Sequence, residues 1–585
     1  MAIKSLEALK FLVRKPVTVR VPYEEKIPSD RYRGLHANDW NLCIGCGNCA
    51  AICTCDAIEM VEIKTLKDEP GKRNLRPRID YGRCSFCGQC VDICPTGSLK
   101  LTADYKLITT DKDDFVRLPI QQMDTTPGKG WISDTEVSYL NYDRMEIKER
   151  KPEERAKDFG WILERRFTPD EAYIEAFRCL GCELCIDGCP TRMKIPTWIK
   201  HIREGDNEKA VQVMFLDNPF SQVCGTVCTH RCEDACVYSH RGSAVRIMHL
   251  KGYGTSMVED YRKALGTKTK KSTGKKVAII GAGPGGLTAA YYLRKEGHRV
   301  DVYEGLDVAG GMMKVGIPRY RLPQEILDKE IGYIKSLGVK IIFGKYLGKD
   351  IKLSSLLKKY HAVLLAIGLH KGTNMGVDGE DLENVLDAVE LLRKVNLGAS
   401  FDLKGRVMVV GGGNTAMDAS RTALRLGADE VIISYRRRKV DMPADEDEIK
   451  EAEDEGVMIW PQTLPIKIRR KGDKLEVEYV ETDMVPVEGE RRPRPVPNMK
   501  KRHRIMVDYV IKAIGQTVDW SILEEDIRER LKFDRHRLHV NKSFMTSIDG
   551  LFAAGDIANR TGDIVSAVRD GKVAAKGIIR YLKKK

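Results

Sequence analysis

The chain has 585 residues, a formal charge of +14 and seventeen cysteines. Its length exceeds what one hydrophobic core organises, so we expect about three to five domains. The first residues lack a signal-peptide core, and no run of about eighteen apolar residues occurs, so we expect a cytoplasmic protein without a membrane span. Lysines cluster without interleaved aromatics, as in residues 263–276, which argues against nucleic-acid binding.

A short apolar stripe of Leu6, Leu9, Leu12 and Val13 opens the chain, and Pro16 ends the predicted helix. Such a stripe can dock on a partner protein or fold back onto the domain that follows it. The sequence leaves both alternatives open.

Two cysteine runs then follow the spacing C-x2-C-x2-C-x3-C, which is the pattern of a ferredoxin with two [4Fe-4S] clusters. Zinc sites use two cysteine pairs rather than two quartets. Three close cysteines wrap one cluster, while the fourth reaches the neighbouring cluster, so the ligand sets are crossed. The predicted sets are Cys43, Cys46, Cys49 and Cys94 for one cluster, and Cys84, Cys87, Cys90 and Cys53 for the other. Residues 1–120 are therefore predicted to form a two-cluster ferredoxin domain.

The first run departs from this pattern, because Thr54 and Cys55 stand after Cys53 where proline is usual. Cys55 is either a small buried hydrophobe beside the cluster, a replacement ligand or a redox-reactive thiol. Cys53 alone keeps the x3 spacing, which favours Cys53 as the ligand.

Residues 121–165 carry no readable chemistry and are predicted to be a linker. A second cysteine field follows in residues 166–270, which we expect to form a helical domain with two further [4Fe-4S] clusters. Its cysteines are Cys179, Cys182, Cys185, Cys189, Cys224, Cys228, Cys232 and Cys236. Sixteen of the seventeen cysteines are thereby used. Four clusters of charge roughly −2 each offset much of the positive charge.

The cysteine-free half begins with a strand, a GxGxxG turn, a helix and a second strand that ends in an acid. In such a dinucleotide-binding fold, Gly281 allows the tight turn, and Gly283 lets a pyrophosphate approach the backbone. Gly286 permits close packing of the helix on the strand. Glu304 is placed to accept a hydrogen bond from a ribose hydroxyl.

A second unit of the same kind carries Gly411, Gly413 and Ala416. Its second strand ends in Arg436, Arg437 and Arg438 rather than an acid. Guanidinium groups bind a 2′-phosphate that an acid would repel, so the predicted nucleotide is NADP(H).

Near the C-terminus, a tight turn at Gly555 places Asp556 between an apolar strand and a helix, which suits capture of a flavin ribityl chain. The flavin-binding domain is therefore predicted to be split into residues 275–375 and 510–585. Residues 376–509 form the inserted NADPH-binding domain. The predicted fold class is a multidomain α/β and α+β protein.

The chain from about residue 150 resembles the small, NADPH-oxidising subunit of glutamate synthase and its relatives. The motifs that carry the resemblance are CLGCELCIDGCP, NPFSQVCGTVCTHRCEDACV, GAGPGGL, GGMMKVGIPRYRLP, GGGNTAMD, YRRR and LFAAGD. The first 120 residues resemble the two-cluster subunit of respiratory NADH dehydrogenases, in which the segment before the first cysteine run lies against partner subunits.

The resemblance implies further site residues. For FAD they are Gly281 to Gly286, Glu304, Gly311, Met312, Arg321, Gly555 and Asp556. For NADPH they are Gly411, Gly413, Asn414, Thr415, Arg436, Arg437, and Ala513 to Gly515. The implied cluster ligands are Cys179, Cys182, Cys185 and Cys236 for one site, and Cys189, Cys228 and Cys232 for the other. The fourth ligand of the second site varies among relatives, and Cys224 is our assignment.

The order of these parts predicts an iron–sulfur flavoprotein oxidoreductase that connects NADP(H), FAD and four [4Fe-4S] clusters. Hydride transfer at flavin N5 requires no general acid or base, so no catalytic side chain is assigned. The isolated histidines are expected to serve packing or surface roles; they are His249, His298, His361 and His370.

The expected partner is ferredoxin or a larger catalytic subunit, in a hetero-oligomeric complex. Formate dehydrogenase, hydrogenase, and aldehyde or 2-oxoacid oxidoreductases are the candidate subunits. The alternatives are the small subunit of a glutamate synthase, a component of an electron-bifurcating NADPH:ferredoxin transhydrogenase, and a non-catalytic scaffold between two enzymes.

Overall fold

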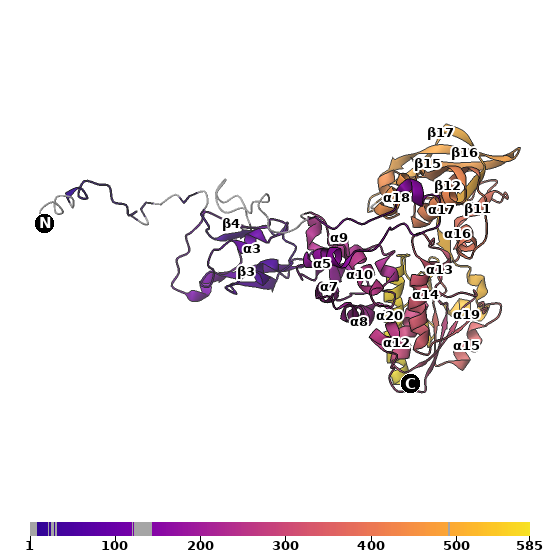
Figure 1. The fold of residues 1–585 in the computed structure, drawn as a ribbon, viewed down its shortest axis with the longest axis horizontal. Helices are drawn as coiled ribbons and strands as arrows, with labels where there is room; N and C mark the ends of the chain where they lie inside the picture. The colour runs from indigo at the N-terminus through magenta and orange to yellow at the C-terminus, as the bar shows by residue number, and fades with distance from the viewer. Residues whose placement is uncertain are drawn as a thin grey trace. The chain divides into compact units, whose positions relative to one another are not determined.

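The structure is a computed structural model that describes residues 9–20, 23–24, 28–29, 32–119, 121, 143–240, 242–489 and 492–585. The chain forms two compact units (Figure 1), which are described separately. The first unit is Met1–Asp143 with Ala235–Ser243, and the second is Arg144–Asp234 with Ala244–Lys585. Leu6 and most of the predicted linker, residues 122–142, lie outside the described residues. No helix in the described ranges is long and apolar enough to cross a membrane.

The first unit contains two small antiparallel sheets and two short helices. One sheet pairs β1 (His36–Asn38) with β4 (Leu99–Leu101), and the other has the order β2 (Ile58–Glu62), β3 (Leu75–Asp80) and β5 (Val116–Arg117). Helices α2 (Asn48–Ala51) and α3 (Gln89–Asp92) each continue a cysteine run. They begin after Gly47 (φ 80°) and Gly88 (φ 86°), whose left-handed backbone turns each loop back around its cysteines. The unit also contains the 3₁₀ helices η1 (Lys112–Phe115) and η4 (Val237–His240).

The apolar stripe at the start of the chain is not packed against this unit. Leu9, Leu12 and Val13 are 54%, 78% and 88% exposed. The alternative in which these three side chains fold onto the ferredoxin domain is therefore not what the structure shows.

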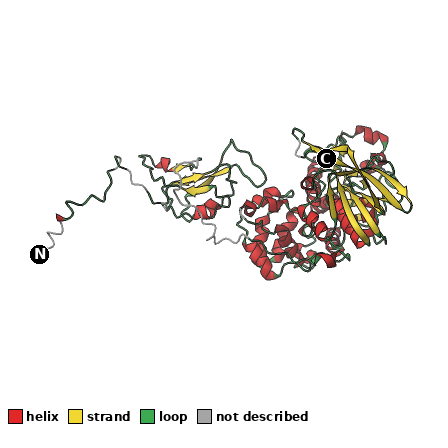
Figure 2. Cartoon of the chain, turned by 90° about the horizontal axis from the view of Figure 1, so that it is seen from above, coloured by secondary structure: helices red, strands yellow, loops and turns green. Residues whose placement is uncertain are grey.

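The second unit begins with a helical region, shown in red in Figure 2. Its helices are α4 (Pro152–Arg155), α5 (Pro169–Phe177), α6 (Leu184–Gly188), α7 (Ile195–Arg203), α8 (Asn207–Asp217), η3 (Val223–Gly225), α9 (Arg231–Asp234), α10 (Ile247–Ser256) and α11 (Tyr261–Leu265). Thr168 and Glu171 form a capping box at the start of α5, and Pro169 follows the cap. Trp198, Phe215 and Phe220 are almost completely buried and form the core of this region.

A five-stranded parallel sheet follows, with the order β22-β9-β6-β7-β8. Its strands are β6 (Lys276–Ile280), β7 (Arg299–Tyr303), β8 (Lys340–Ile342), β9 (Ala362–Leu365) and β22 (Leu551–Ala553). The strands are apolar because helices cover both faces. These helices are α12 (Pro284–Lys295), α13 (Met312–Val315), α14 (Gln324–Ser336), α15 (Leu353–Lys359) and α20 (Ile564–Lys584). The C-terminal strand β22 pairs with β9, so the chain returns to this sheet after a long excursion.

That excursion contains a second parallel sheet with the order β11-β18-β12-β13-β14. Its strands are β11 (Val385–Asp387), β12 (Gly405–Val410), β13 (Ala428–Tyr435), β14 (Met458–Pro461) and β18 (Tyr509–Lys512). Its helices are α16 (Ala388–Asn396), α17 (Asn414–Arg425), η5 (Lys439–Asp441) and α18 (Glu446–Asp454). An antiparallel sheet of β15 (Thr463–Lys471), β16 (Lys474–Val485) and β17 (Arg494–Val507) adjoins it.

The two parallel sheets are joined where β10 (Lys371–Gly372) pairs antiparallel with β19 (Gln516–Thr517). After this junction come the short elements η6 (Trp520–Ile522), α19 (Glu525–Arg530), β20 (Phe533–Asp534) and β21 (Arg537–Leu538).

A buried ion cluster ties the linker to the second sheet. Arg155 of α4 donates to the Glu455 carboxylate at 3.0 Å, and Arg421 and Arg425 of α17 donate to it at 3.0 and 2.7 Å. The guanidinium carbon of Arg425 lies 3.8 Å from the ring centroid of Tyr320, which belongs to the flavin-domain segment. The part of the predicted linker that the structure describes therefore fixes one parallel sheet to the rest of the unit.

We predict that Glu455→Gln lowers the free energy of unfolding of the second unit by about 3–5 kcal/mol, because it leaves buried guanidinium groups without their counter-charge. Burial raises the pKa of Glu455, but hydrogen bonds from Arg421 and Arg425 outweigh it and lower the pKa to about 2. The stabilisation is therefore complete above about pH 4.3, the usual pKa of glutamate, and is lost as the pH falls toward 2. Urea unfolding of the full chain at several pH values measures both effects.

The matched control is Glu453→Gln on the same helix, whose carboxylate is partly exposed and pairs with Lys439. We expect this variant to change the free energy of unfolding by no more than about 1 kcal/mol. Equal effects of the two substitutions would contradict the role assigned to the buried cluster.

Candidate flavin, nucleotide and cluster sites

A cavity of about 330 Å³ lies at the carboxyl ends of the first parallel sheet. Ligands of open α/β sheets bind at this edge. Of the residues predicted to hold FAD, the following line the cavity: Gly281, Gly283, Glu304, Gly311, Met312, Gly555 and Asp556. Gly286 lies beneath the turn and does not line it.

Two glycines of the first fingerprint, Gly281 and Gly286, are required by close backbone contacts. Gly281 has φ 104°, and a Cβ there would lie 2.3 Å from the carbonyl oxygen of Ala366. A Cβ on Gly286 would lie 2.1 Å from the carbonyl oxygen of Gly281. These contacts keep the turn low, so the cavity floor is bare backbone that a pyrophosphate can approach.

Two acids, Glu304 and Asp556, line this cavity, and they differ in their hydrogen-bond partners. The Glu304 carboxylate accepts hydrogen bonds from the main-chain nitrogens of Ala282 (2.7 Å) and Leu306 (2.9 Å), and burial raises its pKa. Oδ1 of Asp556 is buried without a partner among the described residues, and burial, then the charge of Asp563, raise its pKa to about 6. A buried acceptor without a donor on a cavity wall fits a ligand hydroxyl. The cavity therefore fits a flavin nucleotide, and the roles of Glu304 at the ribose and of Asp556 at the ribityl chain stay predictions.

Sequence reasoning missed a basic edge of the same cavity. Arg393 of α16 lines it, donates from Nη2 to the carbonyl oxygen of His370 at 2.9 Å, and keeps a buried Nε without a described partner. His370, for which a packing or surface role was expected, also lines the cavity, and burial and then Arg393 lower its pKa to about 4. No local motif marks Arg393, because it comes from the inserted domain.

Arg321 is not among the residues that line the cavity. It donates to Asp418 at 2.7 Å and also pairs with Glu448, and both acids belong to the inserted domain. The structure thus places Arg321 at the junction of the two domains rather than in the cavity wall.

The second fingerprint repeats the close backbone approach. Gly411 has φ 146°, and a Cβ there would lie 2.2 Å from the carbonyl oxygen of Ala513. Gly413 precedes α17, whose first residues are Asn414 and Thr415. The Thr415 hydroxyl accepts a hydrogen bond from the side chain of Gln516 at 3.4 Å, and Gln516 directly follows Gly515. The structure therefore brings the predicted NADPH residues at Gly411 to Thr415 together with Ala513 to Gly515.

The arginine run after β13 divides into paired and unpaired cations. Arg438 is neutralised by two contacts with Asp441, at 2.8 and 3.0 Å. Arg437 donates from Nε to the carbonyl oxygen of Pro493 at 3.0 Å, which brings Arg492 to the same place. Burial, then Arg437 and Arg492, lower the pKa of Arg436.

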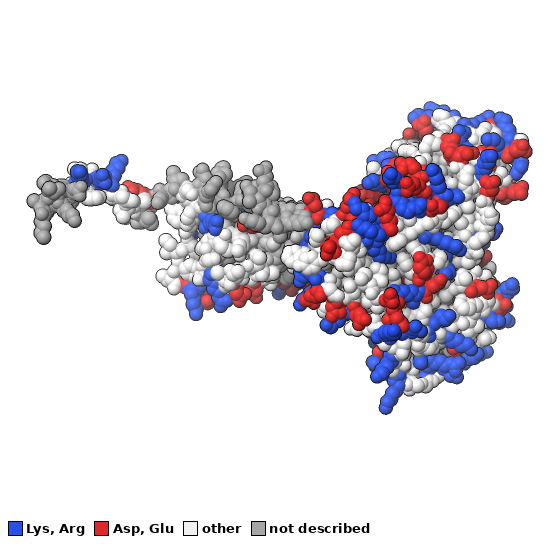
Figure 3. All heavy atoms as spheres, in the orientation of Figure 1, with Lys and Arg blue, Asp and Glu red and all other residues white. Residues whose placement is uncertain are grey.

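Within the described ranges, Arg436, Arg437 and Arg492 form no ion pair with an acid. By contrast, cations and anions are interspersed over the visible face of this domain (Figure 3), and β17 cations such as Lys501 and Arg502 pair with Glu481 and Glu478. Arg492 donates to the carbonyl oxygen of Asp441 at 3.4 Å, so the carboxylate that pairs with Arg438 also lies near this group. Three guanidinium groups that form no ion pair of their own fit the predicted binding of a doubly charged anion. Sequence reasoning missed Arg492 as part of this group. Arg492 stands just before β17, far along the chain from Arg436 and Arg437, and only the fold brings it close to them.

The ferredoxin unit contains two small pockets lined by cysteines. One is lined by Cys43, Cys46, Cys49 and Cys94, and the other by Cys53, Cys84, Cys87, Cys90 and also Cys55. The fourth cysteine of each run therefore lies with the three close cysteines of the other run. This grouping fits two four-thiolate clusters, with ligation itself remaining a prediction.

Cys55 lies on the wall of the second pocket and is partly exposed rather than buried. Its sulfur lies 3.5 Å from the Ser85 hydroxyl, and a hydrogen bond donated by this hydroxyl to the thiolate lowers the pKa of Cys55. The interpretation as a buried hydrophobe is therefore weakened, while the other two stay open.

The helical region gathers a second group of cysteines. Cys224 and Cys228 are neighbours that shift each other's pKa, and Cys232 has Cys189 and Cys228 as electrostatic neighbours. The predicted set of Cys189, Cys224, Cys228 and Cys232 thus lies together. The other set combines Cys179, Cys182 and Cys185 of the second unit with Cys236 of the first, so it stays a prediction.

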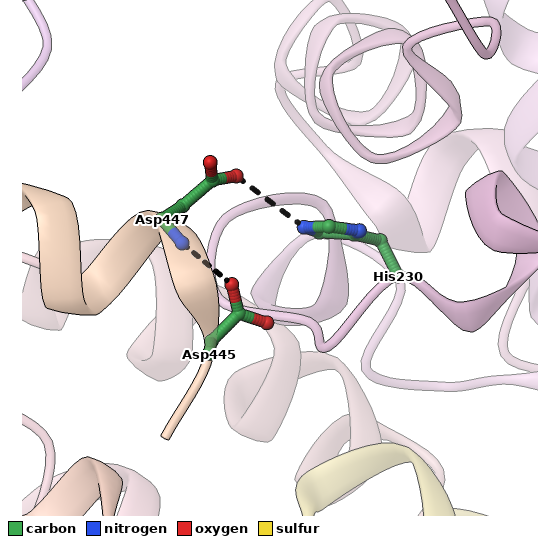
Figure 4. A group of neighbouring side chains, drawn as sticks. All are labelled: His230, Asp445 and Asp447. Carbon is green, nitrogen blue, oxygen red and sulfur yellow. Dashed lines mark hydrogen bonds and ion pairs between the residues drawn. The ribbon is translucent and has the colours of Figure 1, made fainter. Parts of the chain in front are cut away.

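His230, between two of these cysteines, reaches the inserted domain (Figure 4). Its Nε2 lies 3.7 Å from Asp447 of α18, whose main-chain nitrogen donates to Asp445 at 3.1 Å. Ligand atoms of the three side chains lie within 4.8 Å of one another. Because His230 already pairs with Asp447, and the cations Arg144 and Arg246 also act on that acid, we interpret the group as an ion pair that joins two domains.

Comparison with known families assigns each part of the chain. A profile described as pyridine nucleotide-disulphide oxidoreductase matches residues 275–571. One described as dihydropyrimidine dehydrogenase domain II, 4Fe-4S cluster, matches residues 155–263, and a 4Fe-4S dicluster domain matches residues 42–98.

Three curated relatives illustrate the similarity. The NADP(+)-dependent formate dehydrogenase subunit beta of Moorella thermoacetica is 37% identical over 68% of this chain and 60% of its own length. The NADPH-Fe(3+) oxidoreductase subunit beta of Geobacter sulfurreducens is 35% identical over 68% of this chain and 63% of its own length. The glutamate synthase [NADPH] small chain of Azospirillum brasilense is 34% identical over 74% of this chain and 94% of its own length. The chain thus spans less than two thirds of the first two relatives.

The two parallel sheets, the cysteine-lined pockets and these matches define an iron–sulfur flavoprotein oxidoreductase, and they confirm the predicted fold class. The chain belongs to the pyridine nucleotide-disulphide oxidoreductase family, among the relatives of the glutamate synthase small chain that carry 4Fe-4S domains.

We predict that Arg436→Ala and Arg492→Ala each raise the KM for NADPH about 10- to 100-fold, because each removes one charge-assisted contact worth about 1.5–3 kcal/mol. The KM for NADH, which lacks the 2′-phosphate, should be unchanged. Steady-state oxidation of both nucleotides with ferricyanide as acceptor measures this. Arg438→Ala is the matched control, because Asp441 already neutralises Arg438. Parallel losses with NADPH and NADH would contradict a 2′-phosphate site.

We predict that Cys55→Ala keeps the full iron content, whereas Cys53→Ala loses one cluster or converts it to a three-iron form. The reason is that only Cys53 has the spacing of the fourth ligand. Iron analysis and low-temperature EPR of anaerobically purified full-length variants measure the outcome. Equal iron loss in both variants would show that the assignment is wrong.

Proposed function

We propose that the chain passes electrons between NADP(H) and a partner redox protein by way of FAD and four [4Fe-4S] clusters. The observation that supports the proposal is that the cavity is lined by Arg393 from the second nucleotide fold and shares a charged neighbour with a group of four cysteines. Cys228 and Asp556 share Asp563 as an electrostatic neighbour, and Asp556 lines the cavity.

Each domain has a defined task in this proposal. Arg436, Arg437 and Arg492 bind the 2′-phosphate, and the N-terminus of α17 binds the pyrophosphate. Glu304 and Asp556 orient FAD through its hydroxyl groups. When bound, the flavin accepts a hydride and gives up single electrons, which the clusters carry. We assign no side chain to proton transfer during the hydride step.

Four clusters are proposed because sixteen of the seventeen cysteines divide into four sets of four, which leaves Cys55 over. The sets are Cys43, Cys46, Cys49 and Cys94; Cys53, Cys84, Cys87 and Cys90; Cys189, Cys224, Cys228 and Cys232; and Cys179, Cys182, Cys185 and Cys236. Reduced thiols in this number support a reducing compartment, and we propose a cytoplasmic location.

The partner is proposed to be ferredoxin or a larger catalytic oxidoreductase subunit. Formate dehydrogenase is favoured among the candidates, because a relative named as a subunit of an NADP(+)-dependent formate dehydrogenase is 37% identical to this chain. A glutamate synthase large subunit is the second candidate, supported by the 94% coverage of the A. brasilense small chain.

The chain purified anaerobically from its native cells at low salt tests this function. We expect about sixteen irons and one FAD per chain, NADPH-dependent loss of flavin and cluster absorbance, and a stoichiometric oxidoreductase companion in mass spectrometry. A glutamate-forming companion would instead support the second candidate. A protein that binds FAD but is not reduced by NADPH would contradict the proposal.

A further inference from the structure

Lys251 is a lysine buried in the helical cluster region. It lies on α10 and is 5% exposed. Helix α10 packs directly on the turn that carries Cys224, since a Cβ on Gly225 would lie 3.1 Å from the carbonyl carbon of Lys251. The carbonyl oxygen of Lys251 accepts from the Thr255 hydroxyl at 2.8 Å, as expected inside a helix.

The charged surroundings of this lysine are unusual. Among the ion pairs of the described residues, none includes Lys251. Its electrostatic neighbours are the thiols of Cys228, Cys224, Cys232 and Cys189.

Glu330 is a nearby acid, but it does not serve as the counter-charge. Its two carboxylate oxygens accept from the main-chain nitrogens of Gln222 at 2.6 Å and Val223 at 3.1 Å. Burial raises the pKa of Glu330, and among the described residues no ion pair joins it to Lys251. A buried cation without a compensating anion is strongly unfavourable. The four cysteines must therefore supply the negative charge when they hold a cluster.

We propose that Lys251 is the fixed positive charge of the cluster held by Cys189, Cys224, Cys228 and Cys232, and that it raises the reduction potential of this cluster. The proposal rests on the function given above, because it assumes that these cysteines hold a [4Fe-4S] cluster. A cation in a buried site favours the reduced form, which carries one more negative charge.

The cysteine group lies near the flavin cavity, where a raised reduction potential would affect electron transfer. Arg231, next to Cys232, pairs with Asp563, which caps the start of α20, and Ala567 of α20 lines the flavin cavity. The group therefore lies beside the wall of that cavity. NADPH gives up two electrons as a hydride, and this cluster would accept them one at a time, passing each one onward before the next arrives. A raised potential at this position favours transfer out of the reduced flavin.

The test compares Lys251→Met, which keeps the length and removes the charge, with Lys251→Arg, which keeps the charge. EPR-monitored redox titration of the full-length anaerobic protein measures the potential, and the component lost in Cys228→Ala identifies the cluster. At the wild-type midpoint, we expect Lys251→Met to lower the ratio of reduced to oxidised cluster at least tenfold, a shift of about 59 mV for one electron. Lys251→Arg should stay within threefold of wild type.

Lys572→Met is the matched control. Lys572 is a largely buried lysine of the same unit that pairs with Asp217 at 2.6 Å and donates to the carbonyl oxygen of Thr191. Because Lys572→Met alone would leave Asp217 unpaired, the control variant also carries Asp217→Asn; the two substitutions together remove a neutral pair, and we expect the cluster potential to stay unchanged.

An unchanged potential in Lys251→Met with full iron content would overturn the inference. If Lys251→Met loses the cluster, Lys251→Gln is titrated instead with the same expected shift, and loss of the cluster in both variants would overturn the inference in favour of a purely structural lysine. A wild-type protein without an EPR component lost in Cys228→Ala would instead contradict the proposed function, so the two failures are distinguishable.

Discussion

The convergence of Arg155, Arg421 and Arg425 on the single carboxylate of Glu455 fixes the geometry on which the flavin and nucleotide sites depend. The two sites are built on separate parallel sheets, whose strand connection is the short pair of β10 and β19. Two such strands do not hold an orientation by themselves. A buried network with several arginines does so, because any rotation that separates the partners leaves charges unpaired in an apolar interior. Arg321, bound to Asp418 and Glu448, adds a second point of attachment.

Charge pairing also shows where ligands belong. Most cations near these sites have a nearby carboxylate, as Arg438 has Asp441 and Lys572 has Asp217. A few form no ion pair in the described ranges: Arg393 at the flavin cavity, Arg436, Arg437 and Arg492 beyond β13, and Lys251 beside four cysteines. Each lies where the chemistry requires an anion, namely a phosphate or an iron–sulfur cluster. The positions of these unpaired cations therefore indicate where the proposed ligands bind, which the net charge of +14 does not.

The sequence predicted the features that short-range constraints determine. The glycine fingerprints at Gly281 and Gly411 specify a strand, a turn and a helix within about thirty residues, and both parallel sheets follow from them. The crossed grouping of the ferredoxin cysteines has the same basis. Side chains that only tertiary structure brings to a site escaped detection, as Arg393, Arg492 and Lys251 show. For Arg321 the sequence predicted a place at the flavin, whereas the structure shows its guanidinium group paired with Asp418 and Glu448 of the inserted domain.

The ferredoxin unit also constrains where electrons leave. Of the cysteines that line its two pockets, Cys43 and Cys94 of the first set are buried, whereas Cys87 of the second set is exposed. The exposed Cys87 thus brings a ligand of one cluster to the surface. An exposed thiolate shell shortens the distance to a docked redox partner, and solvent exposure also shifts the potential of a cluster. The two pockets therefore differ in that the second, with Cys55 on its wall, has an exposed thiol at Cys87, whereas two thiols of the first pocket are buried.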